Sequence, residues 1–115
     1  MSIKMPANPA EPQTIFNDVT MGYLVKDLTG LGSLVALTDV EAQQAVHVYA
    51  GTLAVNTEII VPSESKIYFV ANATTGAFTL TIKTATGTGI TVAQDNKAIL
   101  VCDGVDVLRF SNDIP

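Results

Sequence analysis

Residues 72–92, NATTGAFTLTIKTATGTGITV, decide the fold. Within this stretch Phe78, Leu80 and Ile82 alternate with polar residues, and this period of two is typical of a half-buried β-strand. Turn signals lie on both sides, at residues 74–76 and 86–89, where glycine supplies the positive φ that tight turns need. Threonine favours extended backbone and presents a hydroxyl to solvent without adding charge. The stretch therefore predicts a β-hairpin scaffold.

The same strand signal continues over most of the chain. We expect one short helix at residues 38–45, because Thr38 followed by Glu41 is a capping-box pattern. Asp103-Gly104 between two apolar runs predicts a hairpin turn. The candidate strands are 19–25, 33–37, 46–50, 57–61, 66–71, 78–84, 90–93, 97–102 and 105–110. Their spacing predicts an all-β fold, an antiparallel β-sandwich or barrel of jelly-roll-like type, and we find no convincing long-period repeat.

Residues 1–18 differ in composition from the rest. Pro6, Pro9 and Pro12 recur at every third residue, which favours an extended, polyproline-like backbone. Ile15 and Phe16 follow, and apolar residues at the end of such a segment favour docking on a surface. We therefore predict an extended N-terminal arm over 1–18 and a single β-rich domain over 19–115. A frayed terminus without a role is the alternative.

Composition limits the classes of partner. Hydrophobic residues make up 48% of the 115 residues and charged residues 15%, so a core is well supplied and an oligomer is indicated. The net charge of −5 argues against binding to nucleic acid. No apolar run approaches the roughly 20 residues that span a bilayer, and no signal peptide is recognisable, so we expect synthesis in a cytoplasm and no membrane partner. Cys102, the single cysteine, is expected to be buried.

Candidate catalytic groups are few. His47 is the only histidine, and its place in an alternating strand favours a structural role. One cysteine and one histidine cannot form a structural zinc site, and TGTG at 86–89 lacks the residues that complete a phosphate loop. We predict no enzyme and no catalytic, cofactor-binding or metal site. The alternatives with the weakest support are a cation site at Asp103, Asp106 and Asp113 and a carboxylate pair, Glu58 with Glu64.

Two predicted strands, KIYFVA at 66–71 and AILVC at 98–102, are apolar on both faces. Such strands lie at the centre of a sheet or against a partner chain. Ile67, Phe69, Ile99 and Val101 are accordingly candidates for the domain core or for an oligomer contact. Tyr49, Tyr68 and Phe69 are expected to fill a core.

Residues 37–110 resemble a module that recurs in tailed-bacteriophage virion proteins, in capsid decoration or head-fibre proteins and in tail-fibre segments. The motifs that carry the resemblance are NATTGAFTLTIKT, GTGITV and ILVCDGVDV. They encode strands and turns and include no catalytic residue. The resemblance implies a β-rich protein, commonly a homotrimer, on the outer surface of a virus particle.

The function expected from the resemblance is that of a capsid decoration (cement) subunit, which binds the assembled head and stabilises it. The partner would be the major capsid protein or another virion protein, with Pro6, Pro9, Pro12, Ile15 and Phe16 as the contact residues of the arm. The alternative is a tail-fibre or head-fibre module that binds a host receptor or carbohydrate. That alternative predicts a groove with exposed Tyr49 or Tyr68.

Overall fold

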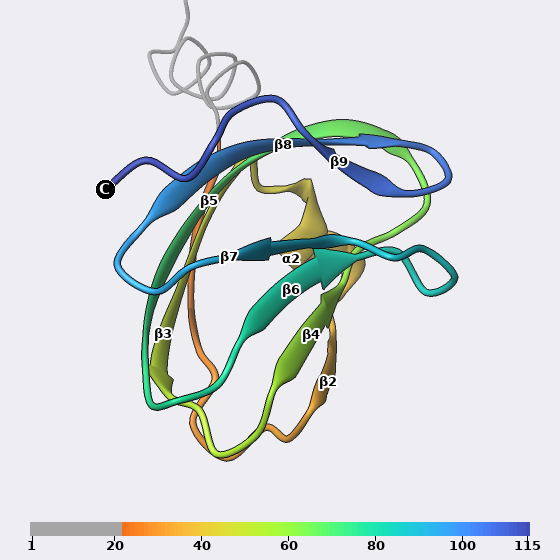
Figure 1. The fold of residues 1–115 in the computed structure, drawn as a ribbon. Helices are drawn as coiled ribbons and strands as arrows, with labels where there is room; N and C mark the ends of the chain where they lie inside the picture. The colour runs from red at the N-terminus through yellow and green to blue at the C-terminus, as the bar shows by residue number, and fades with distance from the viewer. Residues whose placement is uncertain (1–21) are drawn as a thin grey trace, which may run out of the picture.

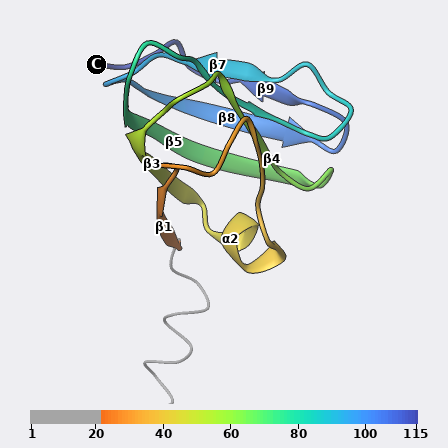
Figure 2. The same cartoon turned by 90° about the horizontal axis from the view of Figure 1, so that it is seen from below.

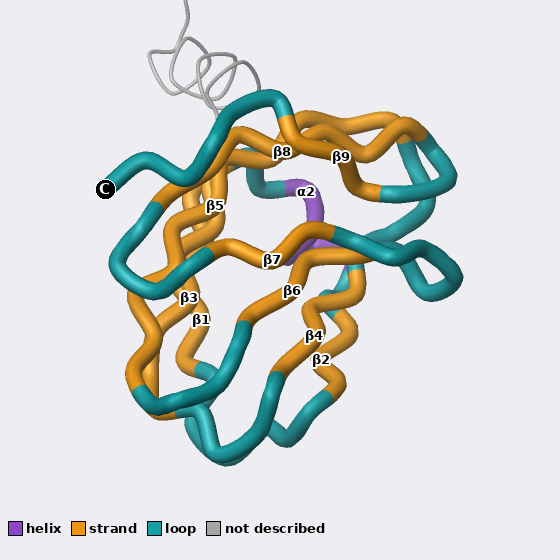
Figure 3. Tube along the Cα trace, viewed as in Figure 1, coloured by secondary structure: helices purple, strands orange, loops and turns teal. Residues whose placement is uncertain are grey.

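The computed structural model describes residues 22–115, so the predicted arm lies outside the described residues. The described chain is mostly β-structure with one short helix (Figures 1 and 3). The strands predicted from residue 46 onward are confirmed to within a few residues. The elements are β1 Tyr23–Asp27, β2 Leu34–Ala36, α2 Asp39–Gln43, β3 Val46–Thr52, β4 Thr57–Ile60, β5 Ser65–Thr75, β6 Leu80–Lys83, β7 Ile90–Val92, β8 Lys97–Asp103 and β9 Val107–Arg109.

The strands form two sheets, which pack against each other (Figures 1 and 2). One sheet has the order β1-β3-β5-β8-β9 and the other β2-β4-β6-β7. From β1 to β6 the chain passes alternately through the first and the second sheet. Strands β1, β3 and β5 are therefore parallel, as are β2, β4 and β6. This part of the chain forms three coils of a short parallel solenoid.

The predicted antiparallel, jelly-roll-like arrangement is therefore wrong, because both sheets are mixed. Only the pairs β5–β8, β6–β7 and β8–β9 are antiparallel. The physical reason is that an alternating strand has the same sequence period whichever way its neighbour runs. The hairpin predicted at residues 86–89 is confirmed as the β6–β7 turn. The signal at 74–76 instead marks a corner, since β5 and β6 lie in different sheets.

A 23-residue structural repeat underlies the coils and corrects the expectation that no long-period repeat is present. Val46 lies between Tyr23 and Phe69 in the first sheet, and each pair is 23 residues apart. Thr57 and Leu80 in the second sheet have the same separation. The repeat is hard to recognise in the sequence because the stacked residues share apolar character rather than identity.

Threonine is the one residue type that repeats at this spacing along a corner of the solenoid. The Thr52 backbone N–H donates to Thr29 Oγ1 at 3.0 Å, and the hydroxyls of Thr52 and Thr75 lie 3.1 Å apart. Gly51 precedes this corner with a φ of +98°, and a Cβ there would lie 2.5 Å from Thr29 Oγ1. The three threonines thus join successive coils where the ladder of one sheet ends.

Helix α2 begins at the predicted capping box. Glu41 N–H donates to Thr38 Oγ1 at 3.2 Å, and Thr38 N–H donates to Glu41 Oε1 at 3.0 Å. The other carboxylate oxygen of Glu41 accepts from Lys26 Nζ at 2.6 Å. Lys26 lies on the inward-facing side of edge strand β1, in register with Tyr49. An inward-facing charge on an edge strand hinders the addition of a further strand.

The core lies between the two sheets. Tyr49, Tyr68 and Leu100 from the first sheet are at most 1% exposed, and Cys102 is fully buried, as predicted. In the second sheet, apolar residues of successive coils stack in register, and they are Val35, Ile59 and Ile82. Each fully buried side chain of this size contributes about 1.5–3 kcal/mol. The stack therefore fixes the register between coils.

Substituting Ile59 by alanine tests this packing. We expect Ile59→Ala to lower the free energy of unfolding by about 2–5 kcal/mol, because Ile59 is fully buried in the middle coil. The matched control is Ile60→Ala on the outward face of the same strand, with an expected cost under about 1 kcal/mol. Urea denaturation followed by circular dichroism measures both. Equal costs would contradict the assignment of inner and outer faces.

Candidate functional site

The outer face of the five-stranded sheet is apolar. Strand alternation turns ten residues away from the core, and this article names them together the apolar face: Tyr23, Val25, Val46, Val48, Ile67, Phe69, Ala71, Ile99, Val101 and Leu108. Tyr23 is 66% exposed and Val25 61%. The residues are in register across neighbouring strands, so they form one continuous surface rather than scattered contacts. A continuous exposed apolar patch of this kind marks an interaction site.

The outer face of the four-stranded sheet has a different character. Glu58 forms an ion pair with Lys83 at 3.7 Å, and the hydroxyls of Thr81 and Thr91 lie 2.9 Å apart. Its exposed apolar residues lie at the edge, with Leu34 on β2. The sequence gives both sheets similar inner faces, so the contrast between the outer faces is what distinguishes a candidate contact surface.

Charges lie at the borders of the apolar face. Lys97 and Asp103 are at opposite ends of β8, and Asp27 is at the end of β1. A hollow of about 280 Å³ opens beside Lys97, and its lining includes Phe69, Ile99 and Ile114. An apolar centre with a polar border is the usual anatomy of a protein–protein interface.

The structure places four predicted contact residues on the apolar face. Ile67 is 46% exposed, and Phe69, Ile99 and Val101 are half-buried, so none of the four belongs to the fully buried core. Strands β5 and β8 occupy the centre of their sheet, as predicted. The oligomer contact stays a prediction for these four. The arm residues Pro6, Pro9, Pro12, Ile15 and Phe16 lie outside the described residues.

His47 is fully buried in the core. Its Nε2 lies 2.7 Å from the Gln44 carbonyl oxygen, which can only accept, so Nε2 carries the proton. Its Nδ1 lies 2.7 Å from the Tyr49 hydroxyl and accepts from it. Burial lowers the pKa of His47 and outweighs the hydrogen bond to Gln44, which raises it. The arrangement holds a neutral imidazole as a structural link between the β3 strand and the loop before it.

Tyr49 and Tyr68 cannot stack on a sugar in this structure. Both are at most 1% exposed, and burial raises the pKa of each hydroxyl, to about 12 for Tyr68. The expected groove with exposed Tyr49 or Tyr68 is therefore corrected, because inward alternation on β3 and β5 takes both rings into the core. The expectation that they fill a core is confirmed.

The carboxylates singled out in the sequence hold turns. Asp106 accepts from the backbone N–H groups of Thr88 and Gly89, each at 3.0 Å, and the Thr88 bond is the main reason that its pKa is lowered. Asp103 accepts from the backbone of its own turn, and this lowers its pKa. Asp113 pairs with Arg109 at 2.9 Å. Within residues 22–115 no group of three or more His, Cys, Asp or Glu side chains is arranged to hold a metal ion.

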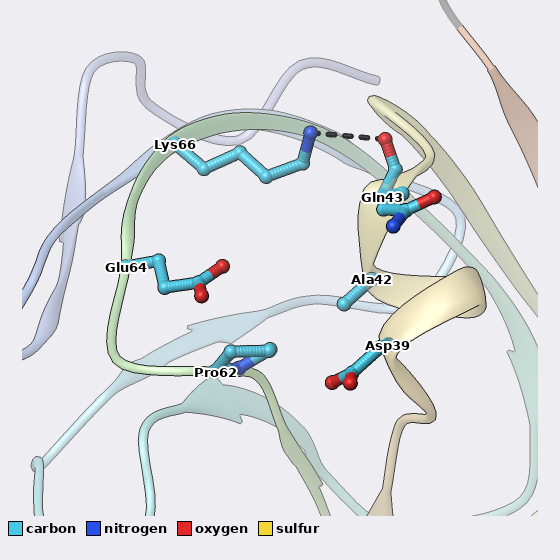
Figure 4. Close-up of a pocket in the computed structure, with 6 residues that line it drawn as sticks. All are labelled: Asp39, Ala42, Gln43, Pro62, Glu64 and Lys66. Carbon is cyan, nitrogen blue, oxygen red and sulfur yellow. Dashed lines mark hydrogen bonds between the residues drawn. The ribbon is translucent and has the colours of Figure 1, made fainter.

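A polar hollow of about 300 Å³ lies between α2 and the start of β5 (Figure 4). The Lys66 ammonium donates to the Gln43 carbonyl at 3.0 Å across its upper end, and Asp39 and Glu64 reach it from opposite walls. The ammonium already has a protein partner, and Asp39 and Glu64 are both exposed. This hollow therefore has the character of a solvated surface depression.

Acidification tests the role of His47. Because its folded-state pKa lies below its unfolded value near 6.5, the unfolded state takes up the proton first as the pH falls. We expect the free energy of unfolding to be unaffected by this group above about pH 7 and to fall as the pH drops below about 6.5. Urea denaturation between pH 7 and 5 measures it. A His47→Gln variant, which has no titrating ring, should lose this slope, and an unchanged slope would contradict the assignment.

No protein-family model, curated protein or solved structure matches this chain. Among the described residues, no helix has the length and apolar character that crossing a bilayer requires. Sequence reasoning found the residues of β5 and β8 on the apolar face but missed Tyr23, Val25, Val46, Val48 and Leu108. The signal that could have found them is the 23-residue spacing, which places Tyr23 and Val46 beside Phe69.

Proposed function

We propose that this protein is a structural subunit of a bacteriophage particle, a capsid decoration protein that binds the outside of the assembled head. The observation that carries the proposal is the apolar face, a continuous surface of ten residues in a domain whose candidate catalytic groups serve structural roles. The resemblance of residues 37–110 to virion modules supplies the setting. The homotrimer that the resemblance implies remains a prediction.

The stabilising mechanism is mass action. A subunit that binds the assembled shell and not its dissociated proteins raises the stability of the shell with its affinity and occupancy. The domain suits this role because it changes little on binding: three coils share one core, and the Thr29–Thr52–Thr75 contacts join them at a corner. A rigid subunit loses less conformational entropy when it attaches.

A host-receptor or carbohydrate-binding module on a fibre is the second candidate. A hollow of about 460 Å³ beside the β5–β6 corner favours it, because its lining includes Phe78, Gln94 and Asp113. Phe78 is 38% exposed, and an aromatic ring beside amide and carboxylate groups suits a sugar. If this candidate is right, Phe78→Ala abolishes glycan binding, and the earlier candidates Tyr49 and Tyr68 affect only stability.

Deletion of residues 2–18 tests the capsid proposal. We expect the deletion to weaken binding to phage heads that lack this protein, because Ile15 and Phe16 supply the apolar contacts of the arm. The free energy of unfolding of the domain should stay the same. Co-sedimentation with the heads measures binding, and urea denaturation measures stability.

The matched variant for this deletion is Ile15→Ser with Phe16→Ser, which keeps the length of the arm and removes only its apolar side chains. Weakened binding by both proteins would support docking of the arm. Full-length protein that does not sediment with the heads would sink the capsid proposal, whereas normal binding by the deletion protein would refute the arm contact alone.

A further inference from the structure

We propose that the apolar face is covered by another copy of this chain. The inference deepens the proposed function, because it names the partner of the same surface, and it rests on that surface being an assembly contact. Three properties of the face favour a second copy over an unrelated partner: its area, its relief and the placement of its charges.

The area is sufficient for a specific contact. Five strands about 4.8 Å apart give a width of about 24 Å, and seven residues of strand give a length of about 20 Å. The face therefore covers on the order of 500 Å² on one subunit, at the upper end of the largest apolar patches on monomers. Two copies would bury about 1,000 Å² in total, which reaches the lower limit for a specific interface.

The relief of the face is complementary to itself. Tyr23 on edge strand β1 is 66% exposed, and the hollow of about 280 Å³ lies farther across the sheet, beside Phe69 and Ile99. One copy therefore offers both a protruding aromatic ring and an apolar hollow. Aromatic rings that enter hollows at the centre of an interface supply much of its binding energy.

The charges also suit two copies. Residues 99–101, midway along β8, carry no charge, whereas Lys97 and Asp103 mark the two ends of the strand. Copies that face each other with antiparallel strands bring opposite charges together. A strongly acidic or basic partner would find no complementary cluster here. The edge of β1 is the less suitable site, because Lys26 and its ion pair with Glu41 guard it.

The test is the native mass of the full-length protein by sedimentation across a range of concentrations, compared with three variants. Ile67→Asp and Val25→Asp each place a carboxylate on the apolar face. Val40→Asp is the matched control, because Val40 is 68% exposed on α2, away from the face. We expect the wild type and the control to contain two or more chains. The two face variants should dissociate at least about tenfold more readily, since burying an unpaired charge is costly.

Circular dichroism and urea denaturation show whether each variant is folded, and Val25→Asp keeps the test decisive if Ile67→Asp unfolds. A wild type that is monomeric at every concentration would overturn the inference, as would association that the face variants leave unchanged or that the control loses equally. A monomer that still binds phage heads would leave the proposed function intact. An oligomer that does not bind them would refute the function and keep the inference.

Discussion

The structure depends on the parallel registration of successive coils. A parallel strand pair needs a crossover connection, and here each crossover passes through the opposite sheet instead of through a helix. One closed circuit takes 23 residues, so the inward side chains of one coil lie over those of the next. Val35, Ile59 and Ile82 meet in this way. Because each coil covers only one side of its neighbour, the middle coil is packed on both sides and the end coils need other protection.

Polar contacts supply that protection. At one end, Lys26 and Glu41 close the first coil, and the capping box that starts α2 holds Glu41 in place. At the other end, the antiparallel strands β7 to β9 replace further coils, and Asp106 ties the β6–β7 turn to the β8–β9 turn. His47 and Tyr49 contribute a buried hydrogen bond within the core. The groups that a search for catalysis would select first are therefore engaged in holding the fold.

The outward side chains carry the functional argument. Strand alternation requires one apolar face per strand, and it leaves the composition of the other face free. The four-stranded sheet uses that freedom for threonine and an ion pair, whereas the five-stranded sheet uses it for valine, isoleucine and aromatic residues. No requirement of the fold explains the second choice, because these side chains pack against nothing else in the described chain. A contact between molecules does explain it.

The sequence by itself determined the strands, the capped helix, the turns at glycine, the burial of Cys102 and the two strands that are apolar on both faces. These features depend on local periods and on near neighbours, which a linear pattern records. Only the tertiary structure decided that the sheets are mixed, that Thr74–Gly76 is a corner, that Tyr49 and Tyr68 face inward, and that Tyr23 and Val46 join Phe69 on one surface. The physical reason is that strand pairing is a long-range choice: the same alternation fits a parallel or an antiparallel neighbour, and the free energy that decides between them comes from side chains 23 residues apart.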